Sequence, residues 1–109
     1  MAAVYGEERV NYYTNDYQFS PQVAGLTGGG YVVTWISRGQ DGSVDGIYAQ
    51  RYNASGSAVG VEFRVNSQTA GYQNDPAITS LADGGFVIAW TDQNGTDGNG
   101  YGVYAQRYD

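Results

Sequence analysis

Short apolar runs bounded by glycine and other turn residues recur along the chain. The clearest are residues 31–36 (YVVTWI) and 86–90 (FVIAW), which are rich in aromatic and β-branched side chains. Each follows a tight-turn sequence, residues 28–30 (GGG) and 83–85 (DGG). This arrangement predicts β-strands. Because no stretch keeps an apolar spacing of 3.6 residues, the pattern predicts essentially no helix.

Weaker patterns predict the neighbouring strands. Residues 21–26 and 76–81 are mostly apolar runs entered through a proline, which suits the first residue of a strand. Residues 47–52 and 103–108 place Tyr, Gln and Tyr on one face and Ala and Arg on the other, and they predict a third strand.

A fourth strand is predicted at residues 59–65, after a turn at residues 53–57. Its counterpart near the start of the chain is residues 7–11. These strands belong to two copies of one repeat of about 55 residues. The matched positions include Glu7 with Glu62, Pro21 with Pro76, Val32 with Val87, Trp35 with Trp90 and, after one inserted residue, GIYAQRY at 46–52 with GVYAQRY at 102–108.

The repeat divides the chain into three parts: an N-terminal segment 1–6, a first repeat 7–61 and a second repeat 62–109. Each repeat runs from its fourth strand through strands one to three. Four short antiparallel strands joined by tight turns are typical of a β-propeller blade. We therefore expect an all-β, β-propeller-type fold with two four-stranded antiparallel blades per chain.

The motif GG(Y/F)V(V/I)xW, followed by a Gly/Asp loop and G(I/V)YAQRY, resembles a tandem repeat of large secreted bacterial proteins. Those proteins are often calcium-binding and adhesin-like. The resemblance covers nearly the whole chain and implies a propeller-blade structural unit and an extracellular, secreted location. It identifies the structural unit better than the function.

The phasing of the repeats leads to a hypothesis about assembly. The second repeat stops at its third strand, and residues 7–11 of another copy could supply the fourth. A ring needs about four to eight blades. Three chains would give six blades and four would give eight, and the trimer is favoured. Two alternatives remain: one eight-stranded sandwich or barrel, or a fragment of a longer array with exposed edges.

The composition limits the catalytic groups and the partners that the chain can have. The chain has 109 residues, no histidine, no cysteine and no lysine, and a net charge of −6. It thus lacks the usual general base, thiolate nucleophile and imine-forming amine. The acidic balance argues against nucleic-acid and membrane partners. The first residues show no signal peptide. We expect no enzymatic activity.

Ligands are expected at one end of the sheets. Residues 12–20, 37–45, 67–75 and 92–101 are long polar loops that share one rim of the predicted blades, and such loops often bind ligands. Aromatic and planar polar side chains in them favour carbohydrate, and repeated weak sites would add avidity. The candidate residues are Tyr17, Tyr72, Tyr101, Arg38, Asp41, Asp92 and Asp97.

A second candidate in these loops is a calcium site. Asp92, Asn94 and Asp97 offer oxygen ligands among glycines, which suits this cation. The loop departs from known calcium loops, lacking the glycine at the sixth position and a distal glutamate. The alternative is a solvated turn with Asx hydrogen bonds. No cofactor is required by the sequence, and calcium is the one it suggests.

Several repeated residues are predicted to be structural. Trp35 and Trp90 end the strongest apolar strands and are expected to pack between blades. Arg51 and Arg107 recur in the third strand, and Arg9 and Arg64 in the fourth, where acidic partners such as Glu7 and Glu62 suit cross-strand ion pairs. The tyrosines also suit packing in a sheet.

Together these features predict a non-enzymatic binding module that self-assembles into a propeller and binds carbohydrate as a lectin does. The alternative is a purely structural repeat of an adhesin-like protein, or a natural or engineered fragment that assembles. The expected partners are further copies of the chain and glycans.

Overall fold

A computed structural model describes residues 6–42, 44–67, 69–93 and 100–109. Within these residues all regular structure is β-strand, which confirms the expected all-β class. The strands are β1 (Gln18–Gly25), β2 (Tyr31–Arg38), β3 (Asp45–Tyr52), β4 (Ala58–Arg64), β5 (Gln73–Ser80), β6 (Phe86–Asp92) and β7 (Gly102–Tyr108).

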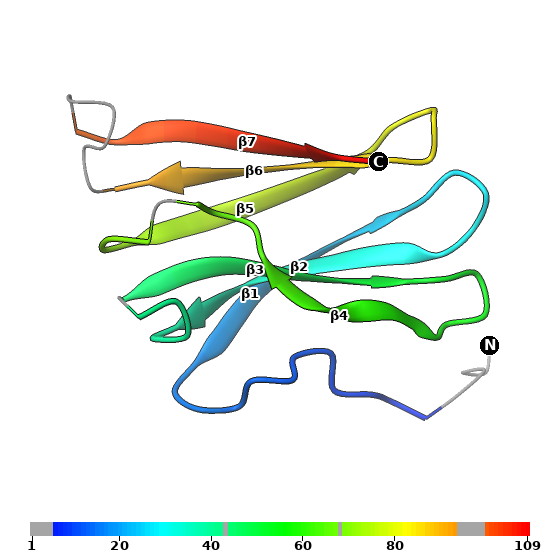
Figure 1. The fold of residues 1–109 in the computed structure, drawn as a ribbon, viewed down its shortest axis with the longest axis horizontal. Helices are drawn as coiled ribbons and strands as arrows, with labels where there is room; N and C mark the ends of the chain where they lie inside the picture. Colours follow the sequence, from blue (N-terminus) through cyan, green and yellow to red (C-terminus); the bar gives the residue numbers. More distant parts are fainter. Residues whose placement is uncertain (1–5, 43, 68, 94–99) are drawn as a thin grey trace.

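The strands form two antiparallel sheets that stack on each other (Figure 1). The first sheet has the order β1-β2-β3-β4 and the second the order β5-β6-β7. The first sheet therefore has the four strands expected of a blade, with β4 at the boundary between the two repeats, whereas the second sheet has three strands among the described residues. The described strands do not form one continuous barrel sheet, because they divide into separate meanders of four and three. Two stacked meanders are compatible both with propeller blades and with a two-sheet sandwich, so the sandwich stays an alternative.

The two meanders have the same internal register. Trp35 lies opposite Tyr48 in the first sheet, and their counterparts Trp90 and Tyr104 lie opposite each other in the second. The aromatic and β-branched residues predicted to form these strands thus pair across them, which is how such side chains stabilise a sheet.

The predicted role of the prolines is wrong. Pro21 and Pro76 do not begin strands but lie inside β1 and β5, where the register shifts between residues 19 and 22 and between residues 74 and 77. The preceding residues, Ser20 and Asp75, both have φ of 55°. A bulge of this kind accepts proline because it leaves the residue out of the hydrogen-bonded ladder.

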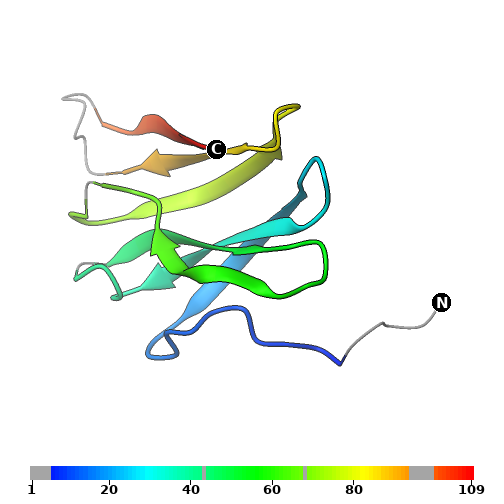
Figure 2. The ribbon, with the colours of Figure 1, turned by 45° about the vertical axis from the view of Figure 1, so that its right-hand side comes forward.

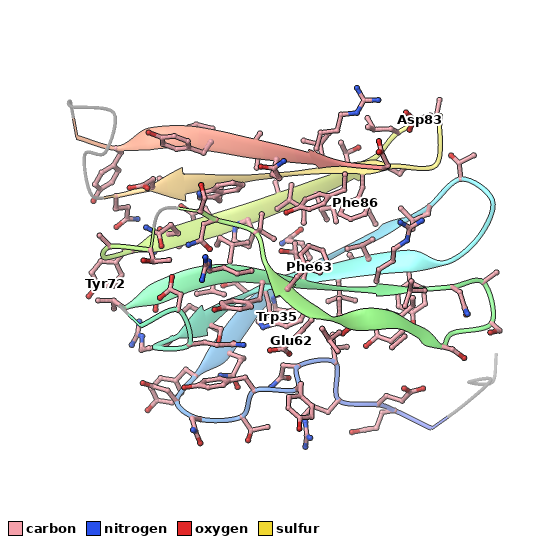
Figure 3. The ribbon with its side chains drawn as sticks, viewed as in Figure 1. Trp35, Glu62, Phe63, Tyr72, Asp83 and Phe86 are labelled. Carbon is pink, nitrogen blue, oxygen red and sulfur yellow. The ribbon has the colours of Figure 1, made fainter. Side chains whose placement is uncertain are left out.

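The core lies between the sheets. Figure 3 shows Phe63 and Phe86 between them. Arg51 lies over the Phe86 ring, 6.0 Å from its centroid, and its Nη1 donates to the main-chain oxygen of Asp109 across the sheets. The core cluster comprises Leu26, Val32, Ile36, Ile47, Ala49, Val65, Phe86, Ile88 and Trp90.

Residues 6–12, called the arm from here on, run along the side of the first sheet that faces away from the second (Figures 1 and 2). We predicted a strand at residues 7–11, but the structure has none there. A strand needs a neighbouring edge to pair with, and the arm has no strand beside it in the described part of the chain.

Candidate functional site: a loop end, two sheet faces and an open edge

The described parts of the long loops lie at one end of the molecule and the tight turns at the other (Figure 1). At the loop end, Arg38 closes β2 and forms a two-pronged ion pair with Asp45 of β3, Nε to Oδ1 at 2.9 Å and Nη2 to Oδ2 at 3.4 Å. This hydrogen bond and the Asp45 charge raise the pKa of Arg38 above its usual value. Asp45 is buried and was missed by sequence reasoning.

Two of the predicted tyrosines lie close to this ion pair. The Arg38 guanidinium carbon is 5.9 Å from the centroid of the Tyr17 ring, and Tyr72 forms an isolated β-bridge with Asp45, the ion-pair partner of Arg38. Tyr17 is 67% exposed and Tyr72 43% exposed. Figure 3 shows Tyr72 at the loop end. The structure thus brings Tyr17, Arg38 and Tyr72 into one exposed cluster.

The other predicted ligand-binding residues are placed differently. Asp41 points inward, with its Oδ2 accepting a hydrogen bond from Asn66 Nδ2 at 3.3 Å. Asp92 is buried at the end of β6, and Tyr101 is exposed just before β7. Asp97 lies outside the described residues.

The suggested calcium loop also falls largely outside them. Asn94 and Asp97 are not described, and Asp92 alone can be placed. In the described residues, no cluster of three or more acidic side chains could hold a metal ion. Calcium binding remains a prediction, and a calorimetric titration of the chain with calcium tests it.

Each sheet has two faces, and the repeat makes them comparable. The valine face of the first sheet consists of Val32, Thr34, Ile36, Ile47, Ala49 and Arg51, and that of the second of Val87, Ala89, Thr91, Val103, Ala105 and Arg107. The tryptophan face of the first sheet consists of Tyr31, Val33, Trp35, Tyr48, Gln50 and Tyr52, and that of the second of Phe86, Ile88, Trp90, Tyr104, Gln106 and Tyr108.

Only one face of each sheet enters the core. The valine face of the first sheet packs on the tryptophan face of the second. Equivalent side chains therefore differ in exposure: Ile47 is 0% exposed and its counterpart Val103 82%, whereas Phe86 is 2% exposed and its counterpart Tyr31 36%. Each sheet thus has an outer face whose residues match half of the central interface. The outer valine face of the second sheet is exposed, whereas the outer tryptophan face of the first sheet is largely covered within the chain, with Trp35 4% and Tyr52 6% exposed.

The arm lies over part of the outer tryptophan face. The main-chain N–H of Tyr12 donates to Glu62 Oε1 at 2.5 Å. Burial is the main cause of the raised pKa of the Tyr52 phenol, and the charges of Tyr31 and Glu8 add to it. Between the arm and β1–β2 is a groove of about 280 Å³, lined in part by Pro21, Val33 and Trp35.

The predicted arginine pairs are only partly reproduced. Arg107 Nη2 lies 2.8 Å from Asp83 Oδ2. Glu62, by contrast, accepts from Tyr12 and from Gln40 Nε2 at 2.6 Å. Arg64 and Arg9 each donate through Nε to the main-chain oxygen two residues on, Asn66 at 2.8 Å and Asn11 at 3.0 Å.

Sequence reasoning missed a polar clasp that joins the repeats. The side-chain oxygen of Asn66 accepts from the main-chain N–H of Ile47 at 2.8 Å, and Asn66 Nδ2 donates to Gln73 Oε1 at 3.2 Å. In the arm, Asn11 Nδ2 donates in the same way to Gln18 Oε1 at 3.1 Å. The signal was present, since Asn and Gln recur at the repeat offset.

Comparison of the chain with protein-family models, with curated proteins and with solved structures found no match. The described residues include no helix of the length and hydrophobicity that crossing a membrane requires.

Proposed function

We propose that the chain is a non-enzymatic, propeller-type assembly module whose partner is a further copy of the same repeat. In this proposal the arm of one copy becomes the outer strand beside β7 of the next copy. The observation that carries it is the polar clasp. The arm already has the Asn11–Gln18 hydrogen bond. The equivalent bond in the second repeat, Asn66–Gln73, lies where β4 pairs with β3.

The repeat also predicts how the arm would pair. In the first sheet Arg64 lies opposite Tyr48 and Phe63 opposite Ala49. The equivalent pairs are Arg9 opposite Tyr104 and Glu8 opposite Ala105 of a second copy.

Two further hydrogen bonds close the equivalent junction within the chain. Val65 N–H donates to Ile47 O at 2.7 Å, and Ile47 N–H donates to Asn66 Oδ1. By equivalence, Val10 N–H would donate to Val103 O of the second copy, and Val103 N–H to Asn11 Oδ1. These bonds would satisfy main-chain groups along the β7 edge, which has no strand beside it in the described part of the chain.

Ring size follows from blade count. Propellers close with about four to eight blades, so three copies with six blades or four copies with eight would form a ring. The contact is heterologous, because one copy gives its arm and the other its β7 edge, and such contacts close when the rotation between copies permits. We favour the trimer.

A proline in the arm tests the strand exchange. Val10→Pro removes the N–H that would donate to Val103 O, and Val10→Ala keeps it while shortening the same side chain. We expect Val10→Pro to lower the association constant of the chain at least about tenfold relative to Val10→Ala, measured by sedimentation velocity. Equal association of the two variants would contradict the proposal.

A second function, carbohydrate binding, is supported by the cluster of Tyr17, Arg38 and Tyr72. Exposed aromatic rings beside a fixed guanidinium are suited to stacking on a sugar and to hydrogen bonding with its hydroxyls. A glycan array tests this with the wild type and the double variant Tyr17→Ala/Tyr72→Ala. Binding by the wild type that the variant loses supports the function, and an array without signal removes it.

A further inference from the structure

The outer faces of the two sheets are the two halves of an interface that the chain already contains once. The valine face of the first sheet is buried against the tryptophan face of the second. The remaining valine face, on the second sheet, keeps valine, alanine and arginine at the positions of Val32, Ala49 and Arg51. The remaining tryptophan face, on the first sheet, keeps the tryptophan and the paired aromatic rings.

We propose that the valine face of the second sheet docks on the tryptophan face of the first sheet of another copy. This inference deepens the proposed function and rests on it, since it takes the same partner. It concerns a different surface, however: the faces of the sheets rather than the β7 edge. The same neighbour can use both, because β4 lies beside β3 of the sheet whose valine face is docked.

A pair of stacked aromatic rings forms the expected contact site for Arg107. Inside the chain, Phe86 and Tyr108 stack with centroids 4.8 Å apart, and Arg51 lies over Phe86. On the outer face, Tyr31 and Tyr52 stack in the same way at 4.7 Å. Arg107, the counterpart of Arg51, would lie over Tyr31 of the second copy, in a cation–π contact equivalent to the one inside the chain.

The free chain can release Arg107 at little cost. Its present partner is Asp83, and both side chains are mostly exposed. Exposed ion pairs of this kind contribute little to stability, so exchanging this pair for a contact with the Tyr31 ring, which docking would bury, is favourable. Figure 3 shows Asp83 at the end with the tight turns, clear of the loop end.

The arm covers the outer tryptophan face in the single chain, and its transfer to a neighbour would open this face for docking. The groove between them is lined by Pro21, Val33 and Trp35 on one side and by residues 8–11 of the arm on the other. Trp35 is 4% exposed under the arm, and its counterpart Trp90 is 7% exposed against the first sheet. The indole N–H of Trp35 is buried and has no acceptor among the described residues. An arriving copy would fill the groove with apolar side chains and bring main-chain oxygens near this N–H.

A charge placed on the valine face tests the docking directly. Ala105 is exposed in the free chain and lies centrally on that face, so Ala105→Arg leaves the fold intact but buries a cation in the docked state. The matched control is Ala82→Arg, which places the same side chain in the exposed β5–β6 turn. We expect Ala105→Arg to lower the association constant at least about tenfold and Ala82→Arg to leave it unchanged, by sedimentation velocity.

The Arg107 contact has its own measurement. We expect Arg107→Gln and Tyr31→Ala each to weaken association about three- to thirtyfold, and the double variant to be no weaker than the weaker single variant. Effects that multiply would show that the two side chains do not meet.

The outcomes separate the two proposals. If the wild type stays monomeric, the proposed function and the docking both fail. If it associates, Val10→Pro weakens association, and Ala105→Arg associates as well as Ala82→Arg, then strand exchange stands and the docking is wrong. Thermal unfolding of each variant confirms that it folds before association is compared.

Discussion

At the scale of single residues, the second glycine of each Gly-Gly pair is required by a close approach of the main chain. A Cβ on Gly85 would lie 2.2 Å from the carbonyl oxygen of Tyr108, and a Cβ on Gly30 2.4 Å from that of Tyr52. Both oxygens belong to the neighbouring strand at the tight-turn end. The double glycine therefore does more than permit a turn, because it lets two strands pack closely where each sheet ends.

This close approach gives a stability prediction. We expect Gly85→Ala to lower the free energy of unfolding by about 1–3 kcal/mol, because the new methyl group must displace main-chain atoms. Gly25→Ala, where nothing lies within 4 Å of the added Cβ, should change it by less than about 0.5 kcal/mol. Urea denaturation of both variants measures the difference, and equal losses would refute the packing explanation.

Asp83 gives a prediction about pH. Its carboxylate accepts from the main-chain N–H of Gly85 at 3.0 Å and pairs with Arg107, and these two interactions, in that order, hold its pKa below the usual 3.8. A lowered folded-state pKa adds stability above the unfolded-state value, and this stability is lost as pH falls through the folded-state value.

The variant Asp83→Asn isolates this contribution. At pH 7 we expect it to unfold at a lower temperature than the wild type, because asparagine keeps the hydrogen bond but loses the charge. Below the folded-state pKa of Asp83 the two proteins should converge. Thermal unfolding followed by circular dichroism from pH 7 to pH 2 measures this, and a difference that persists in acid would show that the charge is not responsible.

At the scale of elements, the junction between the repeats depends on Asn66. This buried amide joins β3 to the start of the second repeat by accepting from Ile47 N–H and donating to Gln73. Asn66→Ala leaves the Ile47 N–H and the Gln73 oxygen without these partners in a buried place. We expect a loss of about 2–3 kcal/mol in the free energy of unfolding.

Asn11 is the matched control for Asn66. It has the same hydrogen bond to its glutamine but lies in the arm, with none of the described strands beside it. We expect Asn11→Ala to change the stability of the single chain by less than about 1 kcal/mol and to weaken association instead, because its side-chain oxygen is the proposed acceptor for Val103 N–H. Similar losses of stability in both variants would contradict this division of roles.

The elements show where sequence reasoning succeeds and where it fails. The strands β2, β3, β6 and β7 were predicted because dense aromatic and β-branched runs identify a strand from its own residues. The entries of β1 and β5 were mispredicted, because a bulge with positive φ at Ser20 and Asp75 carries the strand back past the proline. The arm was predicted as a strand from its likeness to β4, but pairing depends on a neighbour, which no local pattern reveals.

The candidate site was only partly predicted, again because contacts between strands are not visible in a local pattern. The loops were assigned to one end from strand order alone, and their described parts lie at one end (Figure 1). The partner of Arg38 was missed, since Asp45 and Arg38 meet only through the β2–β3 register. That Val103 is exposed while its counterpart Ile47 is buried could not be predicted either. The two repeats have the same pattern, and the pattern does not show which of the two is covered.

At the scale of the whole molecule, the residues of one internal interface recur on the two remaining sheet faces, one exposed on the second sheet and one under the arm on the first. A sheet face that carries Val87, Val103 and Ala105 and remains in water invites association. A chain whose second sheet can dock on the first sheet of another copy can add copies in one direction. The assembly closes into a ring or continues as a filament, depending on the rotation between copies.

Removal of the arm gives a prediction at this scale. A variant that begins at Tyr13 keeps every described strand but loses the arm and with it the proposed outer strand. We expect it to stay folded and to lose most of its association, because the β7 edge of each neighbour is then left without its fourth strand. Circular dichroism checks the fold, and sedimentation velocity checks the mass; undiminished association would show that the arm is not exchanged.

The mass of the intact chain in solution tests the central claim most directly. Sedimentation equilibrium from micromolar to millimolar concentration should show a species of defined mass at a multiple of the 11.7 kDa chain, with three copies as the predicted number. A mass of 11.7 kDa throughout that range would contradict the claim that the chain assembles through its own repeated surfaces.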